Sequence, residues 1–151
     1  MDVQQLYQGI ILDHDRERHH AGLRQPFDVA VTQVNPSCGD ELELRLARDG
    51  DVIVDVSYLG EGCSISRAST SVMTDLVIGG SVQQALRLYD GFVDMLEGQG
   101  DIELDEAVYG DAIAFNGVAQ FPARVKCALL GWSALRDAIA RTEPTKEAAN
   151  D

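Results

Sequence analysis

Residues 27–58 read FDVAVTQVNPSCGDELELRLARDGDVIVDVSY, and they set the architecture expected of this chain. Apolar side chains recur at every second position in three runs, the period of a strand with one buried face. A Pro-Ser-Cys-Gly turn and an Asp-Gly turn separate the runs, and both are typical of hairpins. The stretch therefore predicts a three-stranded antiparallel meander. Its aliphatic face needs helices to cover it, so we expect an α+β fold.

Segments whose apolar residues recur at helical spacing lie before and after these strands in the sequence. The predicted helices cover residues 2–14, residues 64–78, a segment that begins at Ser81 with Gln84 in a capping box, and a last segment from Pro122 to about Arg141. A weaker helical pattern spans residues 104–115. Residues 13–24 are dense in charge and histidine and are predicted to form a loop.

The length of 151 residues suits one domain with a real core. We expect that domain to cover residues 1–141 and the polar tail, residues 142–151, to be disordered. A formal net charge of −13 disfavours nucleic acid as a partner and favours a basic protein surface. No apolar run approaches the roughly 18 residues that a membrane helix needs. The N-terminus lacks the pattern of a signal peptide, so we expect a cytoplasmic protein with reduced thiols and no membrane partner.

Three cysteines are the strongest chemical signal, because an odd number cannot pair completely within one chain. Cys38 lies in the predicted first hairpin turn, and Cys63 directly precedes a predicted helix, whose N-terminus stabilises a thiolate. Cys127 falls opposite the apolar stripe of the last helix, beside Lys126. That stripe consists of Val125, Leu129, Trp132, Leu135 and Ile139. Helical periodicity thus predicts that Cys63 and Cys127 point away from the core, and turn chemistry predicts the same for Cys38.

A donor set follows if the three thiols converge and Asp40, two residues after Cys38, joins them. Three sulfurs and one oxygen suit a tetrahedral zinc ion or an iron–sulfur cluster, and the residue types leave both open. His14, His19 and His20 fall in or near the charged loop. For these histidines a solvated loop is favoured over a second metal site.

The cysteine segments, in their order, resemble the IscU/NifU-N family of iron–sulfur cluster assembly proteins. The resemblance runs from residue 6 to about residue 139 and implies the IscU-like fold. Its motifs are LYQGIILDH at residues 6–14, NPSCGD at 35–40, GEGCSIS at 60–66 and RVKCALLGW at 124–132.

Two departures from the scaffold proteins of that family are similar to its SufU branch. Scaffolds of the IscU type carry histidine immediately before the third cysteine, where this chain has Lys126. An extra segment, roughly residues 98–119, also precedes that cysteine. Members of the branch bind zinc and accept sulfur from the cysteine desulfurase SufS.

The resemblance implies a set of roles for this chain. Its metal ligands are Cys38, Asp40, Cys63 and Cys127; Cys38 is also the sulfur acceptor, and Arg124 acts beside it. The implied activity is that of a sulfurtransferase-like protein with a SufS-type desulfurase as donor and a SufBCD-type scaffold downstream. Two alternatives remain open: a scaffold that assembles a [2Fe–2S] cluster on the same residues, and an interaction domain with purely structural zinc.

Overall fold

The computed structural model describes residues 2–36 and 39–143 of the chain. Its sheet has three antiparallel strands in the order β1 (Val29–Asn35), β2 (Asp40–Asp49) and β3 (Val52–Glu61). This is the predicted meander. Leu44 lies opposite Val31 on one side and Tyr58 on the other, so buried positions align across the sheet.

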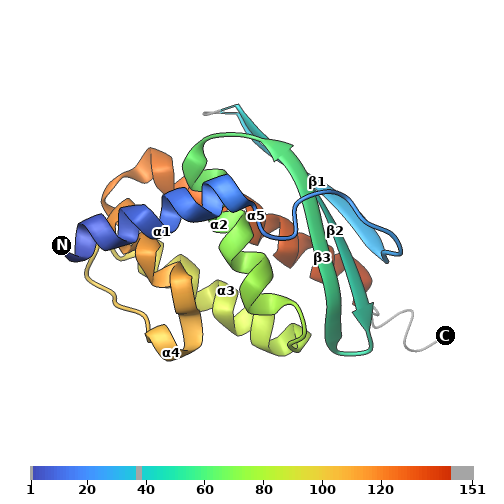
Figure 1. Ribbon diagram of the computed structural model, residues 1–151. Coiled ribbons are helices and arrows are strands. Elements are labelled where there is room, and N and C mark those ends of the chain that lie inside the picture. Colours follow the sequence, from blue (N-terminus) through green and yellow to red (C-terminus); the bar gives the residue numbers. More distant parts are fainter. Residues whose placement is uncertain (1, 37–38, 144–151) are drawn as a thin grey trace.

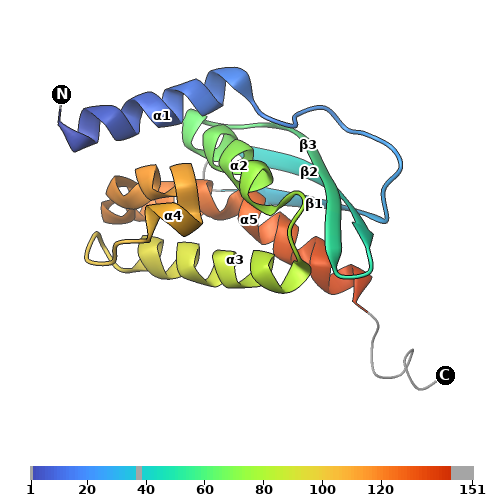
Figure 2. The ribbon, with the colours of Figure 1, turned by 60° about the horizontal axis from the view of Figure 1, so that its bottom comes forward.

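The helices of the described residues lie on one face of the sheet (Figures 1 and 2), the face that carries buried aliphatic side chains such as Leu42, Leu44 and Leu46. They are α1 (Val3–Glu17), α2 (Ser64–Val77), α3 (Val82–Glu97), the short α4 (Glu106–Tyr109), the 3₁₀ segment η1 (Gly110–Gln120) and α5 (Pro122–Thr142). The expected α+β fold is confirmed. None of the helices in the described part of the chain is long and apolar enough to span a membrane.

The last helix, α5, is the centre of the molecule. It packs against β1 and β2 on one side and against α2, α3 and η1 on the other. Trp132 illustrates this, since its ring stacks on Phe92 at 4.5 Å and its Nε1 donates to Ser69 Oγ at 3.1 Å. A helix enclosed on two sides has no single apolar stripe. The sequence pattern therefore understates how much of α5 is buried.

The first helix is longer than predicted. Asp2 caps it through the reciprocal hydrogen bonds of a capping box, but the helix continues to Glu17 and includes part of the expected loop. The extra turn is held by tertiary contacts: Asp15 accepts a 2.6 Å hydrogen bond from Arg67 on α2, and His14 is buried against Ser71. Charge density alone predicted a loop because these partners are distant in sequence.

The segment at residues 98–119 becomes a short loop, α4 and most of η1. It packs against α1, α3 and α5, so the weak helical pattern marks a genuine structural element. Ser81 caps α3 by accepting from the N–H of Gln84, one half of the predicted capping box. Residues 144–151 lie outside the described residues, and the tail and the domain boundary near residue 141 remain predictions.

Candidate metal centre

Asp40 begins β2 at the end of the sheet where β3 leads into α2. Its side chain is only 1% exposed, and Oδ1 accepts the backbone N–H of Cys63 at 3.0 Å. Cys63 is the N-cap residue of α2 and is exposed, as predicted. Its Sγ lies 4.0 Å from Asp40 Oδ2. The carboxylate thus anchors the start of the helix and faces the thiol.

Cys127 approaches the same place from the second turn of α5. It is 4% exposed, which contradicts the prediction that it points away from the core. The reason is the double-sided packing of α5, which places the face opposite the apolar stripe against the sheet. Its Sγ lies 3.6 Å from the carbonyl oxygen of Ala123 and 3.9 Å from Nδ2 of Asn35.

One ligand atom from each of Asp40, Cys63 and Cys127 lies within 4.8 Å of the other two. Two sulfurs and a carboxylate oxygen at this spacing suit zinc or iron, so the donor chemistry fits both metals that the sequence left open. The structure brings together three of the four expected ligands. Cys38 lies outside the described residues.

Two neighbours support the donor set and were not identified from the sequence. Position 62 requires glycine because the Asp40 carboxylate packs against it: a Cβ there would lie 2.6 Å from Asp40 Oδ1. Arg67, one turn after Cys63, donates to the carbonyl of Gly62 at 2.8 Å and to the carboxylate of Asp15. The bonds to Asp15 raise the pKa of Arg67, with smaller contributions from Cys63 and Asp40. The sequence signal for Arg67 was its position four residues after Cys63, about one helical turn further along.

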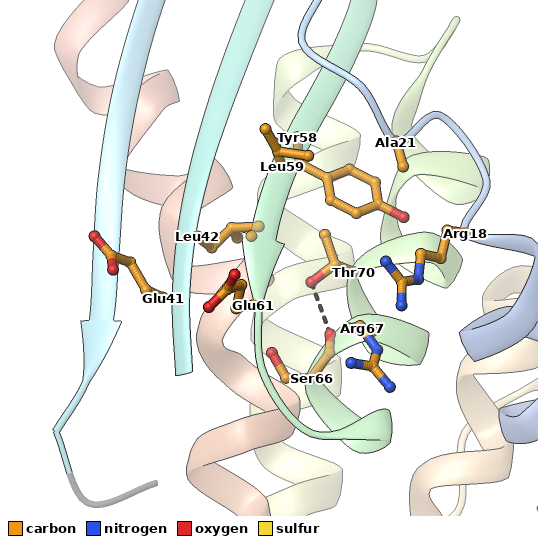
Figure 3. Close-up of a pocket in the computed structure, with 11 residues that line it drawn as sticks. Arg18, Ala21, Glu41, Leu42, Tyr58, Leu59, Glu61, Ser66, Arg67 and Thr70 are labelled. Carbon is orange, nitrogen blue, oxygen red and sulfur yellow. Dashed lines mark hydrogen bonds between the residues drawn. The ribbon is translucent and has the colours of Figure 1, made fainter. Parts of the chain in front are cut away.

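Figure 3 shows the residues that line a cavity between β3 and α2, beside this site. It encloses about 30 Å³, and Tyr58, Arg67 and Thr70 are among the residues that line it. That volume holds about one water molecule. Burial raises the pKa of Tyr58 to about 12, so its hydroxyl stays protonated. Of the three described donors, only Cys63 is exposed, and this cavity offers no room for a small molecule beside it.

A wider groove of about 410 Å³ runs between α1, η1 and the start of α2. Ser64 and Arg124 line the end nearest Cys63, and the half-exposed Phe121 lines it as well. Arg124 is exposed, with its guanidinium 5.1 Å from the ring centroid of Phe121. It lies one turn before Cys127, at the edge of the donor set.

Known proteins resemble this chain in both sequence and fold. Over 137 residues the chain is 44% identical to the iron–sulfur cluster assembly scaffold protein IscU of Streptococcus pyogenes serotype M1, covering 91% of this chain and 84% of that protein. It is 40% identical over 139 residues to the zinc-dependent sulfurtransferase SufU of Bacillus subtilis, covering 91% and 92%.

A solved structure from Fervidobacterium islandicum AW-1 is described as an iron–sulfur cluster assembly scaffold protein for the SUF system. It matches with a TM-score of 0.81 and 39% identity, covering 89% of this chain and 97% of that one. The family model described as the NifU-like N terminal domain matches residues 6–128. The chain therefore belongs to the family of the NifU-like N terminal domain, among relatives named IscU and SufU.

Proposed function

We propose that this chain is a zinc-dependent sulfur acceptor in iron–sulfur cluster biogenesis, and that it takes persulfide sulfur on Cys38 from a SufS-type cysteine desulfurase. The observation that carries the proposal is the convergence of Asp40, Cys63 and Cys127 within 4.8 Å. Cys38, two residues before Asp40 in the sequence, is proposed as the fourth ligand. The name of the B. subtilis relative supports zinc as the metal.

The transfer needs no oxidant. The thiolate of Cys38 attacks the terminal sulfur of the partner's cysteine persulfide, a new S–S bond forms, and the partner's cysteine leaves as a thiolate. The proton on the terminal sulfur stays there, so atoms and charge balance. Bound zinc would keep the donor thiols deprotonated at neutral pH. Cys38 must not be bound to the metal at the moment of attack.

A protein donor agrees with the geometry around the site. The cavity beside Cys63 holds about one water molecule, whereas Cys63 itself is exposed. An exposed thiol is open to sulfur carried on a cysteine at a partner's surface, and the groove lined by Ser64 and Arg124 gives such a partner a contact surface beside it. The net charge of −13 favours a basic docking surface on that partner.

Arg124 is proposed to hold the released thiolate or carboxylate by charge-assisted hydrogen bonds while Cys38 reacts. Among the described residues it has no ion pair, and its stacking on Phe121 leaves the N–H groups available. Arg124→Ala should then lower the stimulation of the desulfurase but retain zinc. Arg136→Ala is the matched control, because Arg136 is exposed on the same helix and stacks on Tyr89, away from the donors.

The central test measures desulfurase turnover with the zinc-loaded and metal-free forms of the full chain. Stimulation should require zinc, and Cys38→Ala should abolish it together with the transfer of labelled sulfur. Retained stimulation by Cys38→Ala would refute the acceptor assignment. Metal analysis should give about one zinc per chain at this site, the stoichiometry of a four-ligand site.

The second candidate is a scaffold that assembles a [2Fe–2S] cluster on the same donors. It is favoured by the 44% identity to the S. pyogenes protein, which is named as a scaffold. Lys126 in place of the scaffold's histidine is the feature that weighs against it. A coloured, iron-bearing protein after anaerobic purification, with no labelled sulfur on Cys38, would support the scaffold.

A further inference from the structure

A second group of metal-ligand side chains lies at the other end of α2. The histidine cluster consists of His14 on α1, His19 just beyond it and Asp75 on α2, and one ligand atom of each lies within 4.8 Å of the other two. Asp75 is twelve residues after Cys63, or roughly 18 Å along the helix axis at 1.5 Å per residue. The cluster is therefore separate from the cysteine centre.

The fold holds both imidazoles in place. His14 is 4% exposed and its Nδ1 lies 2.8 Å from Ser71 Oγ; the same oxygen accepts the backbone N–H of His19 at 2.9 Å. Arg18, the C-cap residue of α1, has a positive φ of 47°, and the chain turns there so that His19 faces α2. The ring of His19 lies 4.6 Å from that of His14, and its Nδ1 is 2.6 Å from Asp75 Oδ2.

The outer nitrogen of each ring faces a carboxylate that is not part of the cluster. Nε2 of His14 lies 2.9 Å from Asp111 on η1, and Nε2 of His19 lies 2.8 Å from Glu17. With the proton on Nε2, each ring donates outward; Nδ1 of His19 then faces Asp75, and Nδ1 of His14 faces the hydroxyl of Ser71. Metal-binding histidines commonly have this arrangement, with a carboxylate on the second nitrogen to fix the ring.

The charge around the cluster also favours a cation. Three carboxylates, those of Glu17, Asp75 and Asp111, surround two imidazoles. Among the described residues, Asp75 and Asp111 form ion pairs with histidines only, whereas Glu17 also lies 3.7 Å from the guanidinium of Arg16. We propose that the histidine cluster binds a divalent transition-metal ion of the class of Zn²⁺ and Fe²⁺, for which two imidazoles and a carboxylate are suitable ligands.

A metal ion there would cross-link the C-terminal turn of α1 to the last turns of α2, and it does not depend on the function proposed for the cysteine centre. The competing explanation is a protonated His19 that bridges Glu17 and Asp75 with no metal. The two explanations differ in stoichiometry, because only the first provides a second metal site without sulfur ligands.

Co²⁺ is the probe, because thiolate ligands give it intense charge-transfer absorption and nitrogen and oxygen ligands give only weak d–d bands. Titration of the reduced, metal-stripped full chain should show two equivalents, one of each kind. His19→Ala and Asp75→Asn should each weaken the second equivalent at least about tenfold and leave the first unchanged. The retained thiolate signal reports that the variants are folded.

His20→Ala is the control for loss of a neighbouring histidine: its ring contacts Thr74 and lies 3.5 Å from Asp75 Oδ1 but is not one of the cluster's ligands, so both equivalents should remain. A single equivalent in the wild-type chain, with thiolate absorption only, would overturn the proposal in favour of the proton-bridged network. A second equivalent that persists in both His19→Ala and Asp75→Asn would equally overturn it. Should His19→Ala unfold the chain, Asp75→Asn decides alone because it preserves side-chain volume.

Discussion

Gly62→Ala should perturb the cysteine centre without altering any of its donors. A Cβ at this position would lie 2.6 Å from Asp40 Oδ1, about 0.8 Å short of an ordinary 3.4 Å contact. The carboxylate has little room to retreat, because Asp40 is 1% exposed and that oxygen accepts the N–H of Cys63. The added methyl group must therefore displace the donor or the loop that carries Cys63.

Two magnitudes follow from this overlap. Overpacking of a buried site costs roughly 1–3 kcal/mol, so the free energy of unfolding measured by urea denaturation in a chelator should fall by that amount. A change in a residue that orients a metal ligand typically weakens metal binding about 10- to 100-fold. For Zn²⁺ this loss can be measured by competition titration against a chromophoric chelator. The first value tests the packing and the second tests the role of Asp40.

Gly9→Ala is the matched control, because a Cβ at Gly9 on α1 meets no atom within 4 Å. It should bind zinc as the wild type does, and stability should rise by about 0.5–1 kcal/mol from the better helix propensity of alanine. Zinc affinity of Gly62→Ala within twofold of the wild type would refute the reasoning, since Asp40 could then not be a ligand held at this position. A loss of stability with unchanged affinity would separate the packing argument from the metal argument.

Three further predictions concern the stability of the fold around the sites. Hydrogen bonds from Arg24 lower the pKa of Asp55, so the pair's contribution is complete above the unfolded pKa of roughly 4 and disappears as the pH falls through the lower folded value. Asp55→Asn should therefore cost about 0.5–1 kcal/mol at pH 7 in chemical denaturation, and a difference that persists at pH 2 would contradict this. Ser69→Ala leaves the buried Nε1–H of Trp132 without its acceptor and should cost about 1–3 kcal/mol of unfolding free energy, whereas a neutral result would show that Trp132 finds another partner. Asp2→Ala removes the capping box of α1 and should cost about 1 kcal/mol, measured by thermal unfolding, with Asp2→Asn close to wild type.

The family assignment agrees with the motifs that carried the resemblance, while the finer choice between sulfur acceptor and scaffold rests on the proposed experiments. Lys126 illustrates why. It is exposed beside Cys127 at the position where the resemblance places the histidine of scaffold proteins, and a lysine there offers no comparable metal ligand. The chemistry at Cys38 therefore has to be measured directly.

The sequence by itself determined the strands and the main helices and indicated the candidate metal donors, because these depend on short-range periodicity and on side-chain chemistry. Alternation at residues 27–58 is visible without any partner, and so is a cysteine directly before a helix. The capping residue Asp2 was predictable for the same reason, since its hydrogen bonds reach only three residues along the chain.

The tertiary structure alone decided what is buried and what converges. Cys127 appeared solvent-facing because one apolar stripe implies one covered face, but α5 is covered on two. The last turn of α1 exists because of contacts to α2 more than fifty residues away, such as the 2.8 Å approach of His14 to Ser71. Asp40 and Cys63 meet because β2 and β3 are paired antiparallel, which returns the chain to the same end of the sheet. Burial and convergence depend on long-range packing, which no local period of the sequence records.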